Sequence, residues 1–238
     1  MKPLLIIKVG DALPVARERG HDFEHWIAAG FRIAASKVRI VDARRACDLP
    51  DPGLLAGAAV TGSAAMVTDR EPWSESLVPW LRHAVEARLP ILGICYGHQL
   101  LAHALGGEVA YHPRGMEIGT VQIRKTAAAV DDPLFASLPR IFPAQAVHSQ
   151  TVLGLPAGAV RLAENEHDAH HAFRFGACAW GVQFHPEFDA EAMHGYIDKF
   201  ATDLAARGRS PEDLRAQVGM TAQAASILQR FARLALDA

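Results

Sequence analysis

A cysteine lies where an apolar run gives way to helical spacing. The segment PILGICYGHQLLAHALGG, residues 90–107, begins with apolar residues and glycine, reaches Cys95 and then becomes helical in pattern. Gly93 and Gly97 lie two residues to either side of it, the spacing of a nucleophile elbow, in which a tight turn holds a reactive side chain clear of the core. The pattern therefore predicts a nucleophilic Cys95. The alternative is a small buried residue, the usual role of an intracellular cysteine.

The helix expected after Cys95 would help its thiol to ionise. Free backbone N–H groups and the dipole at a helix N-terminus favour the thiolate, which is the reactive form. Cys47 and Cys178 lack this setting, and we expect ordinary buried thiols there. Three widely spaced cysteines without an export signal indicate reduced thiols in a cytoplasmic protein.

A thiolate nucleophile needs a proton donor for the leaving group, and that donor needs an orienting partner. The segment GVQFHPEF, residues 181–188, supplies both. His185 precedes a proline, which favours an extended backbone, and in an extended segment residues two apart point to the same side. We therefore expect Glu187 to hold one ring nitrogen of His185 and to leave the other for substrate.

A rival cluster of histidines occurs in HDAHH, residues 167–171. These side chains have the chemistry of metal ligands, but no CxxC or HExxH motif accompanies them. We expect a solvated loop at this segment and predict no metal site.

Acyl chemistry at Cys95 also needs hydrogen-bond donors for the developing oxyanion. In an elbow, one donor is the backbone N–H of the following residue, here Tyr96. The turn in VTGSAAMV, residues 60–67, offers a second, because Gly62 allows close approach of the backbone. The alternative for this segment is an ordinary turn.

The elements that must position these residues predict an α/β fold. A buried strand is expected within residues 4–10, further strands within 37–43, 54–63 and 90–95, and helices within 21–31 and 74–89. Continuous apolar strands between helices are typical of a parallel sheet covered on both faces, with the active site at the carboxyl ends of its strands. Shorter alternating segments between residues 108 and 188 favour antiparallel additions at one edge.

The last part of the chain, from about residue 190, has helical patterns. The final helix carries an apolar stripe of Ile227, Leu228, Phe231 and Leu234. We expect this stripe to pack on the same domain, with a partner surface as the alternative. The prediction is one domain over residues 1–205 and a helical extension, residues 206–238, packed on it.

Composition excludes several classes of function. Half of the 238 residues are hydrophobic, which is enough for a sizeable core, and the formal net charge of −2 gives no basic footprint for nucleic acid. There is no uninterrupted apolar stretch of the roughly 18 residues that a membrane span needs. We expect no nucleic-acid or membrane partner.

The three segments TGS, GICYGHQLLAHALGG and GVQFHPEF occur in the order seen in class I glutamine amidotransferases of the Cys-His-Glu type. The chain resembles that family over about residues 4–200, and within it the free-standing group similar to GMP synthetase. The resemblance implies a doubly wound, mainly parallel, flavodoxin-like sheet and no cofactor. It also implies hydrolysis of the side-chain amide of L-glutamine, through a γ-glutamyl thioester, to glutamate and ammonia.

The resemblance assigns roles to individual residues in this reaction. Cys95 would be the nucleophile, His185 the general acid and base, and Glu187 its partner. The backbone N–H groups of Gly62 and Tyr96 would form the oxyanion hole.

Substrate-binding residues follow from the same resemblance. Gln99 and Ser63 would contact the glutamine, and VHSQT, residues 147–151, would bind its amino-acid end through backbone around His148 and Ser149. The alternative for VHSQT is an ordinary strand end. The segment RGMEIG, which contains Glu117, also resembles the free-standing group, but it receives no role.

Two departures from the family pattern affect the oxyanion turn and the expected partner. Members with a synthetase partner have Gly-Gly-Pro at the turn, whereas this chain has Gly62, Ser63 and Ala64, which keep the backbone donor but lack the rigidity of proline. No Gly-rich phosphate loop of an ATP-binding domain occurs in the 238 residues. We therefore expect a separate synthase subunit to receive the ammonia, and a homodimer is an open alternative to a monomer.

Two other functions compete with the amidotransferase hypothesis. A γ-glutamyl peptidase or transferase would use the same chemistry on γ-glutamyl peptides and differ only in the leaving amine. A non-catalytic module like the stress-response family called DJ-1 would share the sheet and the cysteine elbow. That family lacks the HPE triplet, which argues against it here.

Overall fold

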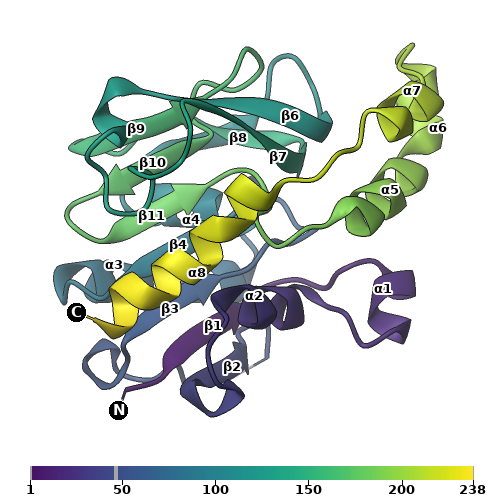
Figure 1. Ribbon diagram of the computed structural model, residues 1–238. Helices are drawn as coiled ribbons and strands as arrows, with labels where there is room; N and C mark the ends of the chain where they lie inside the picture. Colours follow the sequence, from purple (N-terminus) through teal and green to yellow (C-terminus); the bar gives the residue numbers. More distant parts are fainter. Residues whose placement is uncertain (1, 46–47, 238) are drawn as a thin grey trace.

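A nine-stranded sheet forms the centre of the molecule (Figure 1). The computed structural model describes residues 2–45 and 48–237, so Cys47 lies outside the described residues. The strand order is β2-β1-β3-β4-β11-β10-β9-β6-β7. These strands are β1 (Leu4–Lys8), β2 (Val38–Asp42), β3 (Gly57–Val60), β4 (Ile91–Ile94), β6 (Glu117–Lys125), β7 (Ile141–His148), β9 (Ala159–Glu164), β10 (Ala172–Phe175) and β11 (Ala179–Val182).

The sheet is parallel in one part and antiparallel in the other. Strands β2, β1, β3, β4 and β11 pair in parallel, and β10, β9, β6 and β7 continue in antiparallel order. The predicted α/β class with antiparallel additions at one edge is confirmed. One segment differs from the prediction, because β11 pairs in parallel with β4 as well as antiparallel with β10. Val182 therefore lies beside Ile94, and both strands end at the same edge of the sheet.

Helices cover both faces of this sheet. The residues of β1 alternate between the two sides, so that Leu4 and Ile6 join α2 (Phe23–Phe31) and α8 (Ala222–Leu236), while Leu5 and Ile7 join α3 (Pro72–Glu86) and α4 (Tyr96–Ala104). Ile227, Leu228 and Phe231 of the predicted apolar stripe are buried in the first of these clusters. The boundary between residues 205 and 206 stays a prediction.

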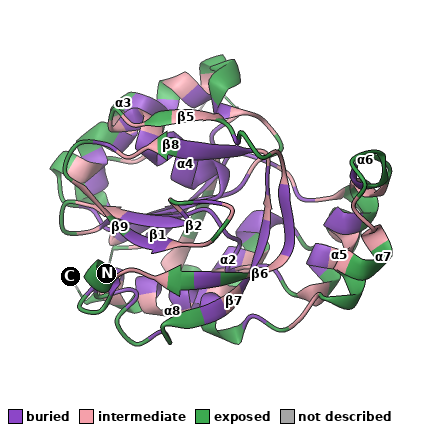
Figure 2. Ribbon diagram, turned by 90° about the horizontal axis from the view of Figure 1, so that it is seen from above, coloured by how far each residue is buried: buried purple, intermediate pink, exposed green. Residues whose placement is uncertain are grey.

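The remaining elements are short. A two-stranded sheet consists of β5 (Glu108–Tyr111) and β8 (Gln150–Gly154). Helices α5 (Ala190–Lys199), α6 (Ala201–Ala206) and α7 (Pro211–Ala216) lie together to one side of the main body in both views (Figures 1 and 2). The other elements of the described residues are helix α1 (Pro14–Glu18) and the 3-10 turns at Ala35–Lys37, Pro52–Leu54, Val67–Asp69 and Ala127–Ala129. Among the described residues, no helix is long and apolar enough to cross a membrane.

Two glycines allow the turn between β4 and α4. A Cβ atom at Gly93 would lie 2.4 Å from the carbonyl oxygen of Gly97 and 2.8 Å from the backbone nitrogen of His98. A Cβ atom at Gly97 would lie 2.5 Å from the carbonyl oxygen of Val60. These are backbone atoms, which cannot rotate away, so only glycine lets α4 begin so close to the ends of β3 and β4.

We expect Gly93→Ala to lower the free energy of unfolding by about 1–3 kcal/mol, because the added methyl group overpacks the turn. Denaturant unfolding measures the change. Gly219→Ala is the matched control, since no atom lies within 4 Å of a Cβ placed there. Equal stability of the two variants would contradict this account of the turn.

Candidate active site

Cys95 lies at the tip of the turn between β4 and α4. Its backbone has φ 50° and ψ −99°, a positive φ that is strained for a residue other than glycine. Two backbone hydrogen bonds hold this geometry: Cys95 N–H donates to Val182 at 2.8 Å, and Gly97 N–H donates to Thr61 at 3.2 Å. Cys95 as a residue is 7% exposed, and its Sγ lies 3.8 Å from the Val147 carbonyl oxygen. The backbone strain is of the kind that nucleophile elbows carry.

His185 and Glu187 follow β11 in the arrangement that their spacing predicts. The Nδ1 atom of His185 lies 2.8 Å from Oε1 of Glu187, and both side chains are buried. The His185 backbone N–H donates to the carbonyl of Gln145 at 2.7 Å, which fixes the segment against β7. The Phe188 ring stacks on the imidazole, with centroids 4.1 Å apart. The other nitrogen, Nε2, has no hydrogen-bond partner among the described residues.

The electrostatic setting favours a charged His185. Burial alone would lower the pKa of His185, but the Glu187 carboxylate and the neighbouring Cys95 outweigh it and raise this pKa to about 10. A histidine with this pKa is an imidazolium at neutral pH. It can therefore stabilise a thiolate and donate a proton to a leaving amine.

We expect Glu187→Gln to move the alkaline limb of the pH–activity profile to lower pH, because the main cause of the raised His185 pKa is removed. At slightly alkaline pH the loss in kcat/KM should be about 100-fold. Initial rates measured across neutral and alkaline pH test this. A uniform loss with an unchanged limb would show that Glu187 does not hold the charge on His185.

A cavity of about 900 Å³ joins the candidate residues. Cys95, Tyr96 and His185 line it together with Ser63 and Ser149. It is open to solvent at its mouth, and its walls also include Leu13, Tyr196 and Phe200.

The two expected oxyanion donors lie at this site. Within the described part of the chain, neither the Gly62 N–H nor the Tyr96 N–H donates a hydrogen bond. A Cβ atom at Gly62 would lie 3.1 Å from Cε1 of His185, so this turn lies directly beside the imidazole. Tyr96 follows Cys95 as the first residue of α4. Their assignment as an oxyanion hole stays a prediction.

The four residues expected to bind substrate differ in which of their polar atoms are available for hydrogen bonds to it. Ser63 and Ser149 lie on the cavity wall. Gln99 uses both hydrogens of its amide nitrogen on the protein, at 2.8 Å to the Gln150 carbonyl and 2.9 Å to Oε1 of Gln183. Only its carbonyl oxygen is left for a substrate. The His148 ring is likewise engaged within the protein, so its backbone is the part available to the cavity.

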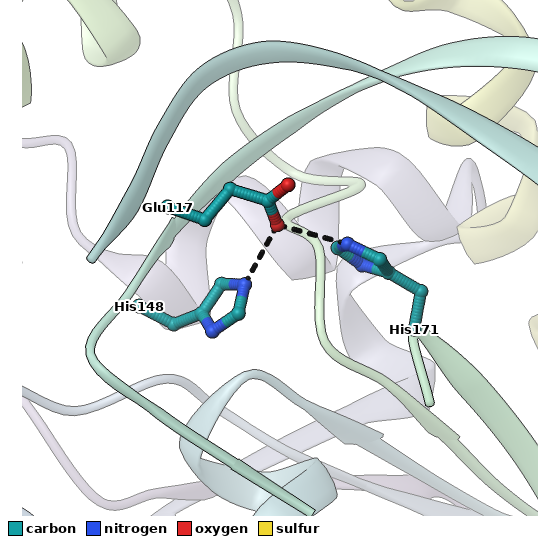
Figure 3. Close-up of side chains that lie close together, drawn as sticks. All are labelled: Glu117, His148 and His171. Carbon is teal, nitrogen blue, oxygen red and sulfur yellow. Dashed lines mark hydrogen bonds and ion pairs between the residues drawn. The ribbon is translucent and has the colours of Figure 1, made fainter. Parts of the chain in front are cut away.

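The sequence reasoning missed a buried cluster next to this cavity, which we call the Glu117–His148–His171 cluster (Figure 3). Nε2 of His148 and Nε2 of His171 each lie 2.9 Å from Oε2 of Glu117. Burial alone would raise the pKa of Glu117, but the two histidines outweigh it and lower this pKa. Burial would lower the pKa of His148, yet Glu117 raises it.

The expectation of a solvated loop at residues 167–171 is wrong in part. Asp168 is 1% exposed and His171 is 0% exposed, because the segment folds inward before β10 and closes over Glu117. Three segments of the sequence analysis each held one member: RGMEIG contains Glu117, VHSQT contains His148 and HDAHH contains His171. No local pattern joined them, although a buried acidic residue needs a partner.

The sequence is similar to known proteins of one family. A family model described as glutamine amidotransferase class-I matches residues 21–204. A GMP synthase (glutamine-hydrolyzing) of Thermosipho africanus is 37% identical over 50% of this chain. A GMP synthase (glutamine-hydrolyzing) subunit of Methanocaldococcus jannaschii is 40% identical over 44% of this chain and 54% of its own length. Gamma-glutamyl peptidase 5 of Arabidopsis thaliana is 28% identical over 60% of this chain and 58% of its own length.

The extent of these matches differs between sequence and structure. This chain spans about a quarter, 23%, of the length of the first GMP synthase it matches. The crystal structure of a glutamine amidotransferase from Thermotoga maritima matches 99% of both chains, with a TM-score of 0.73 at 20% identity. That likeness shows a shared fold over the whole described chain.

Proposed function

Since this chain belongs to the glutamine amidotransferase class-I family, we propose that it is a cysteine-dependent hydrolase of γ-glutamyl amides, with L-glutamine as its substrate. One observation carries the proposal. A strained elbow presents Cys95 to the same cavity as His185, whose Nδ1 atom lies 2.8 Å from the buried carboxylate of Glu187. A nucleophile, an acid–base group and its orienting partner are the parts that covalent acyl transfer requires.

In the proposed reaction the Cys95 thiolate attacks the side-chain carbonyl of glutamine. The resulting oxyanion would accept hydrogen bonds from the N–H groups of Gly62 and Tyr96. The C–N bond then breaks as His185 gives its proton to the departing nitrogen, which leaves ammonia and a γ-glutamyl thioester. His185 next removes a proton from water, and the hydroxide formed cleaves the thioester to the free thiolate and the γ-carboxylic acid, which loses its proton to solvent as glutamate.

The position of the substrate is part of the same proposal. With the carbonyl carbon at Cys95, the amino-acid end would reach the backbone of His148 and Ser149. Gln99 supports this arrangement, because its amide nitrogen ties α4 to the Gln150 carbonyl. The carbonyl oxygen of Gln99 and the Ser63 hydroxyl would then contact the substrate directly.

A second candidate, γ-glutamyl peptide hydrolysis, is favoured by the size of the cavity. A volume of about 900 Å³ is larger than glutamine requires, and the walls include the largely apolar side chains of Leu13, Tyr196 and Phe200. A bulkier leaving amine would fit this space. A peptidase is also among the relatives that the chain resembles.

Ammonia released from glutamine needs an acceptor. The relative from Methanocaldococcus jannaschii is named as one subunit of a GMP synthase, a name that implies a further chain in that enzyme. We propose a separate synthase chain as the acceptor here, docking at the mouth of the cavity. Homodimer formation and a cytoplasmic location stay predictions.

Release of ammonia and glutamate by the purified chain distinguishes these functions. L-glutamine, a γ-glutamyl dipeptide and glutathione are tested side by side, with Cys95→Ala as the control. Turnover of glutamine supports the amidotransferase, and turnover of the peptides alone supports the peptidase. No turnover of any of them would contradict hydrolysis by the isolated chain, and equal rates in the Cys95→Ala variant would remove Cys95 from the mechanism.

A further inference from the structure

The Glu117–His148–His171 cluster has no role in the proposed reaction. Its members come from the start of β6, the end of β7 and the segment before β10, and Figure 3 shows their polar ends converging. One ligand atom from each lies within 4.8 Å of the others, and all three residues are buried. Two imidazoles and one carboxylate meet here without a cysteine.

We propose that Glu117, His148 and His171 bind one divalent transition-metal ion, for which zinc is the best fit. Zinc is held by imidazole nitrogen and carboxylate oxygen, and sites with two histidines and one glutamate keep a fourth position open. Magnesium and calcium prefer shells of oxygen ligands, which this cluster does not offer. The inference does not depend on the proposed hydrolysis.

Within this cluster, the described residues leave the His171 ring without a hydrogen-bond partner. Its side chain is 0% exposed, and neither ring nitrogen has a hydrogen-bond partner among the described residues. Nε2 lies 2.9 Å from Oε2 of Glu117, close enough for an ion pair but without the geometry of a hydrogen bond. A buried imidazole nitrogen without a partner is costly, and a metal ion beside the carboxylate would satisfy it.

Hydrogen bonds from neighbouring groups orient the other two ligands, His148 and Glu117. Nδ1 of His148 lies 2.9 Å from the Gln150 carbonyl oxygen, to which it donates, and this leaves Nε2 as the ligand atom. Asn165 donates to Oε1 of Glu117 at 2.6 Å, which leaves Oε2 toward the histidines. Outer hydrogen bonds of this type fix the tautomer and rotamer of metal ligands.

The two nitrogen–oxygen distances need only a small adjustment, and the ligand atoms of the two histidines lie within 4.8 Å of each other. With metal–ligand bonds of about 2.0–2.1 Å in a tetrahedral site, ligand atoms lie about 3.3 Å apart. Both nitrogen–oxygen separations are 2.9 Å here, so binding requires a displacement of a few tenths of an ångström. The competing account is a metal-free ion pair in which Glu117 faces both His148 and His171. That account leaves Nε2 of His171 in a contact without hydrogen-bond geometry.

A bound ion would act on the neighbouring site through the backbone. His148 and Ser149 lie at the wall of the Cys95 cavity, and the Gln150 carbonyl accepts from both His148 and Gln99. The metal would therefore hold the loop from 148 to 150 in position.

The test uses the full chain in a Cys95→Ser background, so that the active-site thiol cannot bind zinc. After treatment with a chelator, zinc and cobalt(II) are titrated and bound metal is measured after gel filtration. We expect one ion per chain, a cobalt(II) spectrum of a low-coordinate nitrogen–oxygen site, and a higher Tm with zinc.

Substitutions then locate the ion. His171→Gln and Glu117→Gln should each weaken binding about 10-fold or more and abolish the Tm shift. His170→Gln is the matched control, because Nδ1 of that neighbouring histidine faces the Val152 carbonyl, outside the cluster. If Glu117→Gln does not fold, metal binding by His171→Gln alone tests the proposal. Less than stoichiometric binding in the parent, or unchanged binding in His171→Gln, would overturn the proposal.

Discussion

Cys95→Ala is expected to abolish turnover of every γ-glutamyl substrate. Removing a nucleophile leaves only binding and oxyanion stabilisation, so kcat should fall by about five to six orders of magnitude. Unfolding should remain cooperative, because the backbone hydrogen bond from residue 95 to Val182 does not need the thiol. Ammonia and glutamate release measures the loss.

Cys178→Ala is the control for that result. This thiol lies 3.2 Å from the Arg88 carbonyl, where β11 begins, and does not line the cavity. Its burial raises the pKa of the Cys178 thiol, which keeps it protonated and unreactive. Activity lost in Cys178→Ala, or retained in Cys95→Ala, would contradict the assignment of the nucleophile.

His185→Gln is expected to have the second largest effect. Glutamine fills similar space but can neither carry the charge that stabilises the thiolate nor transfer a proton to the leaving amine. The loss in kcat/KM should be about four orders of magnitude or more, with slower alkylation of Cys95 by electrophiles. Steady-state rates and the rate of alkylation measure the two consequences separately.

His103→Gln supplies a matched comparison. His103 also faces a glutamate, with Nε2 3.1 Å from Oε1 of Glu75, but it lies near the end of α4 and does not line the cavity. This variant should keep full activity. A similar loss in both would mean that His185→Gln acts through general destabilisation, and full activity in His185→Gln would remove it from the mechanism.

Much of the fold follows from local pattern. Continuous apolar runs predicted β1, β3 and β4, and glycine spacing predicted the turn at Cys95. The parallel pairing of β11 with β4 was not predictable from alternation alone, because a strand in the middle of a mixed sheet has neighbours of both kinds. That pairing carries His185 to the thiol, and in sequence only the HPE triplet pointed to it.

In the site, too, contacts between residues near in sequence were predictable, and contacts between distant residues were not. His185 and Glu187 are two residues apart, so local geometry predicts their contact. The Glu117–His148–His171 cluster joins residues up to 54 positions apart, as the sequence numbers show, and depends on β6 pairing with β7 and on the turn before β10. No local pattern shows which of the 12 histidines are buried together.

The central claim is that Cys95 attacks a γ-glutamyl group, and alkylation by an electrophilic glutamine analogue tests it most directly. Intact mass and peptide mapping report the number and position of labels. We predict one label per chain, on Cys95, with labelling slowed by L-glutamine or a γ-glutamyl dipeptide and much slower in His185→Gln. Labelling spread equally over Cys95 and Cys178, or unaffected by either substrate, would contradict the claim and favour a non-catalytic module.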